Sequence, residues 1–244
     1  MHNSAPTAPS QQVLVVDGDA GWTDLLAEYL RAEEVSVVVT DNCDEALTAA
    51  KNLQPRIILL DADVRGGDGM QLCRRMRTLS DGHITMLTAR RDEGTTIAGL
   101  AAGADDVLAK PISSREIAAR IRAIRRRLHA SPADHTVGSY SENPPARQVF
   151  GRLCVDIARR EVFLADEQIS LTRTEFEILA MLAQRPGAVT TRQEMLDAVW
   201  GSRWAGSITN IHVHIGHLRR KLGDDPARPL LVLNVRGIGY RLAV

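Results

Sequence analysis

Polar side chains that could bind a cation or accept a phosphoryl group follow most of the short apolar runs in the first half of the chain. Carboxylates follow the first and third runs, a threonine the fourth, and a Lys-Pro pair the fifth: Asp17, Asp19, Asp61, Asp63, Thr88 and Lys110. Carboxylate oxygens are ligands that Mg²⁺ prefers, and a carboxylate beside Mg²⁺ and a lysine can form an acyl phosphate. Polar residues also cap parallel strands without any function. That alternative weakens because all of these residues lie just after their runs and would fall at the same edge of one sheet.

The apolar runs alternate with longer segments that have helical spacing. The runs are residues 13–16, 35–39, 57–60, 84–87 and 107–108, and the segments are residues 22–32, 44–53, 70–79, 95–102 and 114–128. This alternation predicts an α/β domain, a (βα)5 doubly wound parallel sheet with helices on both faces. Functional groups of such folds gather beyond the carboxyl ends of the strands, so the polar side chains should meet at one edge of the sheet.

A segment without apolar period follows this domain. Residues 130–147 are rich in Pro, Ser and Gly, which is typical of an interdomain linker. We therefore predict a disordered N-terminus at residues 1–11, a first domain at 12–129, a linker at 130–147 and a second domain at 148–244.

The second domain has the pattern of a small α+β fold. Residues 153–171 alternate in a way that favours antiparallel strands, and Thr172-Arg-Thr-Glu175 and Thr191-Arg-Gln-Glu194 fit capping boxes that open two helices. A third helix carries an apolar stripe, and Arg236-Gly-Ile-Gly239 lies between two final strands as a hairpin turn. A small sheet, three helices and a terminal hairpin predict a winged helix-turn-helix domain.

The third helix could present its polar face to DNA. Opposite its apolar stripe we expect these residues to be exposed: Asn210, His212, Val213, His214, Gly216, His217, Arg219 and Arg220. An α-helix fits the major groove, where polar side chains can bond base edges and Val can touch a thymine methyl group, while arginines contact phosphates. The plain alternative is a solvated helix face. Gly216 in mid-helix costs up to about 1 kcal/mol relative to Ala.

Charge and histidine spacing refine this interpretation. The chain has 30 basic and 30 acidic residues and no formal net charge, yet residues 200–241 are locally basic, as a phosphate-facing surface would be. A zinc site of His212, His214 and His217 is disfavoured, because no cysteine is near and His212 and His214 point to different sides of a helix.

The remaining composition excludes several classes of protein. The three cysteines, Cys43, Cys73 and Cys154, are far apart and form no CxxC pair, which argues against a disulfide framework and for a reducing compartment. No apolar run approaches the length of a membrane span, and residues 1–10 lack a signal-peptide pattern. We therefore expect a cytoplasmic protein without membrane contact.

The chain after residue 12 resembles the OmpR/PhoB-type response regulators of bacterial two-component signalling. The motifs of the first domain are Val-Leu-Val-Val-Asp17, Ile-Ile-Leu-Leu-Asp61, Gly66-Gly-Asp-Gly69, Met86-Leu-Thr88-Ala-Arg90, Gly103-Ala-Asp-Asp106 and Lys110-Pro111. Those of the second domain are Ile211-His-Val-His-Ile-Gly-His-Leu-Arg-Arg-Lys-Leu222 and Asn234-Val-Arg-Gly-Ile-Gly-Tyr-Arg-Leu242, which look like a recognition helix and a wing.

The resemblance implies a role for particular residues. Asp61 would be the phospho-acceptor, Thr88 the switch hydroxyl and Lys110 the phosphoryl clamp, and Mg²⁺ would bind at Asp17, Asp61 and Asp63. The wing arginine, Arg236, would reach the minor groove, and the loop at residues 200–206 would touch RNA polymerase. Dimerisation would use the side of the receiver that carries Asp105, Asp106, Glu116 and Arg120. The implied partners are promoter DNA, a second copy of the chain and a sensor histidine kinase.

Several positions depart from the family pattern. Gly18 stands where a second acidic residue usually binds Mg²⁺, Val107 replaces the aromatic residue that moves with the switch hydroxyl, and Arg65 replaces a proline. Asp19 and Asp63 are the candidates to replace the missing carboxylate. In the recognition helix, His212 and His217 replace an acidic residue and an arginine that reads bases.

The sequence leaves two mechanisms open. In one, phosphorylation of Asp61 drives dimerisation and DNA binding; in the other, an atypical receiver acts without phosphate, through constitutive dimerisation or a bound ligand. A rival function is an adaptor whose winged helix binds protein instead of DNA. An autonomous enzyme finds no support, because the sequence offers no nucleophile–base pair beyond the self-chemistry of Asp61.

Overall fold

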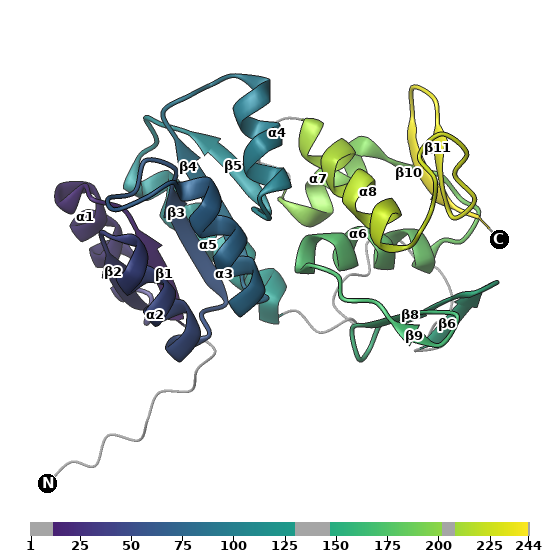
Figure 1. Cartoon of the computed structure of the whole chain (residues 1–244), viewed down its shortest axis with the longest axis horizontal. Coiled ribbons are helices and arrows are strands. Elements are labelled where there is room, and N and C mark those ends of the chain that lie inside the picture. The colour runs from purple at the N-terminus through teal and green to yellow at the C-terminus, as the bar shows by residue number, and fades with distance from the viewer. Residues whose placement is uncertain (1–11, 130–146, 202–207, 244) are drawn as a thin grey trace, which may run out of the picture. The chain divides into compact units, whose positions relative to one another are not determined.

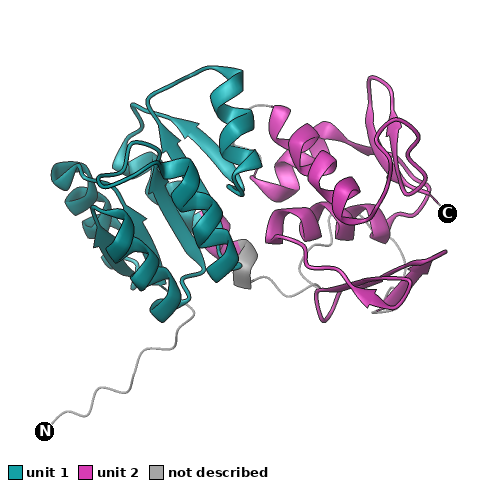
Figure 2. Ribbon diagram, in the orientation of Figure 1, with its two compact units in different colours: residues 1–122 teal, residues 123–244 magenta. Residues whose placement is uncertain are grey.

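The computed structural model describes residues 12–129, 147–201 and 208–243, and the chain forms two compact units, residues 1–122 and 123–244 (Figure 2). The expected disordered N-terminus and nearly all of the expected linker lie outside the described residues. The division between the units falls earlier than the predicted domain end at residue 129, inside a helix that itself ends at His129.

The first unit is a five-stranded parallel sheet with flanking helices (Figure 1). The elements are β1 Gln12–Val16, α1 Ala20–Arg31, β2 Ser36–Thr40, α2 Cys43–Leu53, β3 Ile57–Asp61, α3 Gly69–Leu79, β4 His83–Thr88, α4 Glu93–Ala101, β5 Asp106–Ala109 and α5 Ser114–His129. The strand order is β2-β1-β3-β4-β5, and every pairing is parallel. The predicted doubly wound α/β fold is therefore confirmed.

The residues of the central strands explain why the sheet is covered on both faces. Every residue of β3 and β4 is buried. The residues of β3 are Ile and Leu up to its final Asp61, and Ile, Met and Leu make up half of β4, which fits strands covered on both faces. The helices begin where a polar residue caps them: the side chains of Asp19, Asn42, Asp68 and Asp92 each accept a hydrogen bond from a backbone N–H of the first turn.

In the part of the second unit that the structure describes from residue 147 onward, there are three helices and two antiparallel sheets. Its elements are β6 Arg147–Phe150, β7 Leu153–Asp156, β8 Glu161–Leu164, β9 Glu167–Gln168, α6 Arg173–Gln184, β10 Thr190–Thr191, α7 Arg192–Val199, α8 Thr209–Lys221, β11 Val232–Val235 and β12 Gly239–Leu242. The sheet orders are β6-β7-β8-β9 and β10-β12-β11. Both predicted capping boxes are present, at Thr172 with Glu175 and at Thr191 with Glu194. This is the predicted winged helix.

Apolar side chains from all three helices and both sheets form one core in this unit. Phe176 and Leu179 from α6, Ile215 from α8, Val155 from β7 and Leu242 from β12 are among its members. The predicted linker is one residue too long, because Arg147 pairs with Asp156 and begins β6. No helix among the described residues is long and apolar enough to cross a membrane.

Candidate carboxylate pocket and nucleic-acid interface

Asp17, Asp61 and Lys110 meet at the carboxyl ends of the parallel strands, as the sequence predicts. Lys110 Nζ lies 2.8 Å from Oδ2 of Asp17 and 2.7 Å from Oδ2 of Asp61. Asp17 ends up beside Asp61 because β1 and β3 are neighbours, and both carboxylates are largely buried. Burial disfavours the ammonium charge, but the hydrogen bonds and charges of the two carboxylates outweigh burial and raise the pKa of Lys110.

The second oxygen of each carboxylate accepts a hydrogen bond from the backbone. Asp17 Oδ1 accepts from the N–H of Asp19 at 2.9 Å, and Asp61 Oδ1 accepts from the N–H of Asp63 at 3.1 Å. Each carboxylate is therefore held at one oxygen by the local turn and at the other by the lysine. This arrangement fixes both side chains in the pocket without any further group.

The residues at this edge do not fit a carboxylate-bound Mg²⁺ site. Gly18 supplies no ligand, the Asp19 carboxylate caps α1 by accepting from the N–H of Trp22 at 3.0 Å, and Asp63 is exposed. Across the described ranges, no three His, Cys, Asp or Glu side chains come together in a way that could hold a metal ion. The two carboxylates that are present are bridged by an ammonium, whereas Mg²⁺ requires near-octahedral oxygen coordination. The positions of Asp19 and Asp63 therefore give no support to the idea that either carboxylate replaces the one missing at Gly18.

Thr88, the expected switch hydroxyl, lies on β4, and Val107, which stands in the place of the usual aromatic residue, lies on β5. Thr88 ends β4 and pairs with Ala109, and its Oγ1 accepts a hydrogen bond from the N–H of Arg90 at 3.1 Å. Val107 packs directly under α4: a Cβ added at Gly99 would lie 2.8 Å from Val107 Cγ2 and 3.1 Å from the sulfur of Met86. Gly99 thus allows α4 to lie close to the side chain of Val107.

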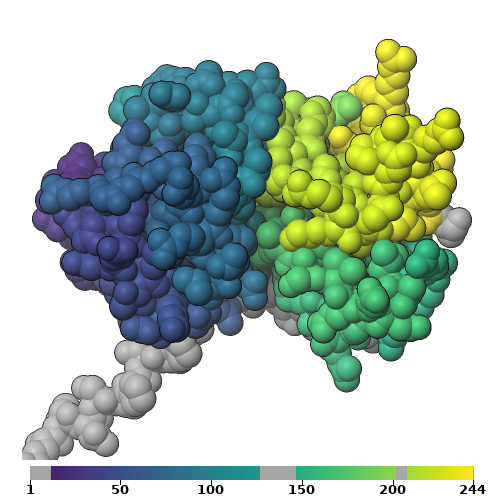
Figure 3. All heavy atoms as spheres, in the orientation of Figure 1, coloured from purple at the N-terminus to yellow at the C-terminus, as the bar shows by residue number. Residues whose placement is uncertain are grey.

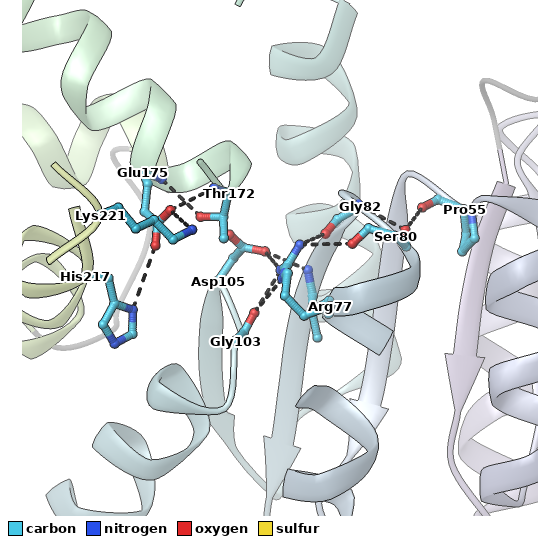
Figure 4. Close-up of polar contacts among 11 residues, drawn as sticks. Pro55, Arg77, Ser80, Gly82, Gly103, Asp105, Thr172, Glu175, His217 and Lys221 are labelled. Carbon is cyan, nitrogen blue, oxygen red and sulfur yellow. Dashed lines mark hydrogen bonds and ion pairs between the residues drawn. The ribbon is translucent and has the colours of Figure 1, made fainter. Parts of the chain in front are cut away.

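Asp105, predicted to lie at a dimer surface, is instead an interior residue. Its Oδ2 accepts hydrogen bonds from Arg77 at 2.5 Å and from the N–H of Ile84 at 2.9 Å. Arg77 also donates to the carbonyls of Gly103 and Gly82, so that one guanidinium ties α3 to two loops (Figure 4). The prediction is wrong for Asp105 because its carboxylate is fully buried inside this unit and paired with Arg77, so it is not available at a surface.

The other three dimer candidates have different surroundings. Asp106 is buried and accepts a hydrogen bond from the N–H of Val107 at 2.9 Å. Glu116 and Arg120 form an ion pair of 2.9 Å one turn apart on α5, and Glu116 is exposed. Of the four predicted dimer residues, only Glu116 and Arg120 therefore remain candidates for a contact at the surface.

The exposed face of α8 is narrower than the sequence predicts. His212 and Arg220 are exposed and Val213, Gly216 and His217 are half-buried. The remaining predicted members of this face, Asn210, His214 and Arg219, are buried. The prediction fails for these three because α8 contacts neighbours on more than one side, so its buried arc is wider than one apolar stripe.

Arg219 and His214 show how α8 is held inside the unit. The guanidinium of Arg219 donates two hydrogen bonds to the carbonyl of Val232, at 3.1 and 2.6 Å, which fixes α8 against β11. The ring of His214 lies beside that of Trp200, with centroids 5.8 Å apart. Arg219 therefore positions α8 rather than reaching outward.

Glu175 connects the start of α6 to α8. Its Oε2 accepts from the N–H of Thr172 and from Lys221 Nζ, both at 2.7 Å, and its Oε1 lies 3.9 Å from Nδ1 of His217 (Figure 4). Burial, followed by the nearby His214 and the charges of Arg220 and Lys221, lowers the pKa of His217 to about 4, against the opposing charge of Glu175. His217 is therefore neutral at neutral pH.

This low pKa predicts that the second unit loses stability in mild acid. The unfolded histidine titrates near 6.5, so between pH 6.5 and 4 the unfolded state binds more protons and stability falls as the pH falls. The loss attributable to His217 reaches about 3 kcal/mol by pH 4. Urea unfolding of wild type and His217→Gln across this range measures it: the variant should show a flatter pH dependence, and parallel curves would contradict the assignment.

The hairpin of β11 and β12 carries the last candidate. Arg236 is exposed, and the adjacent Gly237 has φ +79°, a conformation that favours glycine at the turn. In the space-filling view, the atoms of α8 adjoin those of the C-terminal hairpin on one face of the second unit (Figure 3). Of the loop expected to touch RNA polymerase, Trp200 is buried, and residues 202–207 lie outside the described residues.

Comparisons with known proteins agree with both units. Residues 13–122 match the response regulator receiver domain, and residues 166–242 match the C-terminal domain of transcriptional regulatory proteins. The DNA-binding response regulator MtrA of Mycolicibacterium smegmatis is 38% identical over 232 residues, covering 95% of this chain and 96% of the relative. The sensory transduction protein RegX3 of the same organism is 35% identical, covering 94% and 98%.

A solved structure supports the fold of the whole chain. A mutant of the protein RitR superposes with a TM-score of 0.72 over 95% of this chain and 98% of that one, at 24% identity. Both domains match in this order, and the similarity extends along nearly the full length of the relatives. The chain belongs to the OmpR/PhoB-type DNA-binding response regulators, with a receiver domain followed by a winged-helix domain.

Proposed function

We propose that this protein is a sequence-specific transcriptional regulator whose receiver controls dimerisation and DNA binding without phosphorylation of Asp61. The proposal that the protein binds DNA rests on one observation. α8 has an exposed face and a basic C-terminal end, and the wing carries the exposed Arg236. The relatives named DNA-binding response regulators support it.

The DNA contacts are divided between the helix and the hairpin. α8 enters the major groove with His212 and Val213 toward base edges and Arg220 toward phosphate, and the neutral His217 lies at the edge of this face. Arg236 reaches the minor groove from the wing. Asn210, His214 and Arg219 support the helix from inside the domain.

The receiver half of the proposal is carried by Lys110. Its ammonium already bridges the carboxylates of Asp17 and Asp61. Gly18 leaves the pocket with two carboxylates, and Val107 supplies no aromatic ring to move with Thr88. A pocket held in one arrangement by its own residues suits a constitutive dimerisation module. Glu116 and Arg120 on α5 are the candidates for the contact with a second copy.

These assignments determine the partners. The proposed partners are double-stranded promoter DNA, a second copy of the chain and RNA polymerase. A protein with these partners would act in the cytoplasm. A sensor histidine kinase would be dispensable. Mg²⁺ would not be a resident cofactor, because the donor set of the pocket does not fit it.

The DNA interface is tested by substituting the two exposed arginines. Arg220→Ala and Arg236→Ala should each weaken binding to a duplex selected by the wild-type chain by about tenfold. Each should also make the slope of the logarithm of the binding constant against the logarithm of the salt concentration shallower by about one. Fluorescence anisotropy at several salt concentrations measures both effects.

Arg159→Ala is the matched control, because it removes the same charge from an exposed position between β7 and β8. It should leave the affinity unchanged. If neither Arg220→Ala nor Arg236→Ala changed binding, the DNA face would be misassigned. If the wild-type chain showed no salt-dependent affinity for any duplex, the protein-binding adaptor would replace the regulator.

A further inference from the structure

Gly216 is a glycine that the fold itself does not require. It lies in the middle of α8, and a Cβ added there would meet no atom within 4 Å beyond the helix's own backbone. Its φ lies outside the left-handed region, where a side chain would be strained. Neither packing nor backbone conformation therefore accounts for the absence of a side chain.

Three glycines elsewhere in this chain have visible structural reasons. A Cβ at Gly69 would lie 2.5 Å from the carbonyl oxygen of Ala62, and one at Gly239 would lie 2.0 Å from that of Thr190. Gly237 has a positive φ in the wing turn. Glycine in a helix interior is destabilising relative to alanine. At Gly216 the helix is therefore less stable than it would be with alanine, and no contact or backbone conformation within the domain requires the glycine.

The position of Gly216 suggests that the glycine serves a contact with a binding partner. His212, Gly216 and Arg220 are spaced four residues apart on one face of α8, and the two flanking side chains are exposed. Gly216 is thus a notch between two longer polar side chains, at the centre of the face proposed to meet DNA.

The dimensions of DNA make such a notch useful. A helix with its side chains is about 10–12 Å across, and the major groove is about 12 Å wide, so a helix that reads bases fits with little space to spare. Removing the side chain at the central position lets the backbone of α8 approach the base edges by about one carbon–carbon bond. Glycine is the usual residue where a backbone approaches a ligand closely.

We propose that Gly216 is a specificity-determining residue at which the backbone of α8 lies against the floor of the major groove. This inference rests on the proposed function and adds a position at which the protein reads the shape of its site. Any side chain at residue 216 would hold the helix away from the bases. The flanking His212 would then lose its contacts with the base edges, whereas contacts with phosphates would be preserved.

The test uses the full chain with Gly216→Ala and Gly216→Leu, two residues that favour helices. Thermal midpoints and affinities are measured for a duplex selected by the wild-type chain from a random library and for a scrambled duplex of the same length. Both variants should raise the thermal midpoint of the second unit, by roughly 4 °C. Both should weaken binding to the selected duplex, by about tenfold for the larger side chain. Binding to the scrambled duplex should change less than twofold, because non-specific affinity comes from phosphate contacts.

Gly21→Ala is the matched control. Gly21 is an exposed helical glycine in α1, where an added Cβ makes only an ordinary contact of 3.6 Å with Asp19. It should stabilise its own helix and leave DNA affinity unchanged.

The outcomes separate this inference from the proposed function. If the wild-type chain binds the selected duplex and both Gly216 variants bind it equally well or more tightly, the inference is overturned and the function stands. If both duplexes lose affinity equally, Gly216 does not determine specificity. If the wild-type chain binds no duplex, both the inference and the function fail.

Discussion

Replacing Gly18 with aspartate should give this receiver a Mg²⁺ affinity at least about tenfold above that of the wild type, which corresponds to about 1.4 kcal/mol. The new carboxylate would be the third at the edge of the sheet where Asp17 and Asp61 already meet. The structure has room for it, because a Cβ at Gly18 meets nothing within 4 Å and the residue does not adopt a positive φ. Mg²⁺ binds through oxygen donors, and a third carboxylate competes with the lysine for the other two.

Isothermal titration of Mg²⁺ into the full chain measures this effect. Gly18→Asn is the matched control, because its side chain has nearly the same shape as aspartate without the charge. The aspartate variant should bind Mg²⁺ more tightly than both the wild type and the asparagine variant. Equal affinity in all three chains would show that the missing carboxylate is not what weakens the site.

Replacing Lys110 with methionine should destabilise the receiver by about 3 kcal/mol at neutral pH, because it leaves two buried carboxylates facing each other without a counter-charge. The ammonium is 2.8 and 2.7 Å from their oxygens, so no other group in the described structure replaces it at both positions. Mg²⁺ should also stabilise this variant more than the wild type, since a cation can take the place of the ammonium.

Urea unfolding of the full chain measures these changes, with Lys51→Met as the control. Lys51 is an exposed lysine near the end of α2 in the same unit, and its substitution should cost less than about 0.5 kcal/mol. Equal stability of the Lys110 and Lys51 variants would contradict the structural role given to the lysine bridge.

The fold and the carboxylate pocket could be predicted because their signals are local. Each strand of the receiver is a short apolar run, and parallel strands must end at a common edge, so Asp17, Asp61 and Lys110 had to converge. The capping boxes at Thr172 and Thr191 follow from residue types three positions apart.

The helix cap at Asp19 also had a local signal that the sequence interpretation did not use. An aspartate directly before an amphipathic segment is typical of an N-cap, and the structure shows its carboxylate bound to the N–H of Trp22. A cap and a metal ligand are competing uses of one carboxylate. The local signal favours the cap here.

The misplaced residues depend on partners that are far away in the sequence. Asp105 is interior because Arg77, on another helix, supplies a guanidinium to it, and nothing in the local sequence distinguishes it from a solvated acid. Arg219 is buried because the carbonyl of Val232 accepts its hydrogen bonds. A helical period identifies one apolar stripe, but it does not show how many neighbours will pack against the helix.

The central claim is that this regulator binds DNA without phosphorylation of its receiver. The most direct measurement combines the intact mass of the full chain and its affinity for the selected duplex, before and after treatment with acetyl phosphate and Mg²⁺, beside an Asp61→Asn control. We predict an unchanged mass and an unchanged affinity, equal to those of the control. A gain of about 80 Da, one phosphoryl group, absent from Asp61→Asn and accompanied by tighter DNA binding, would contradict the account.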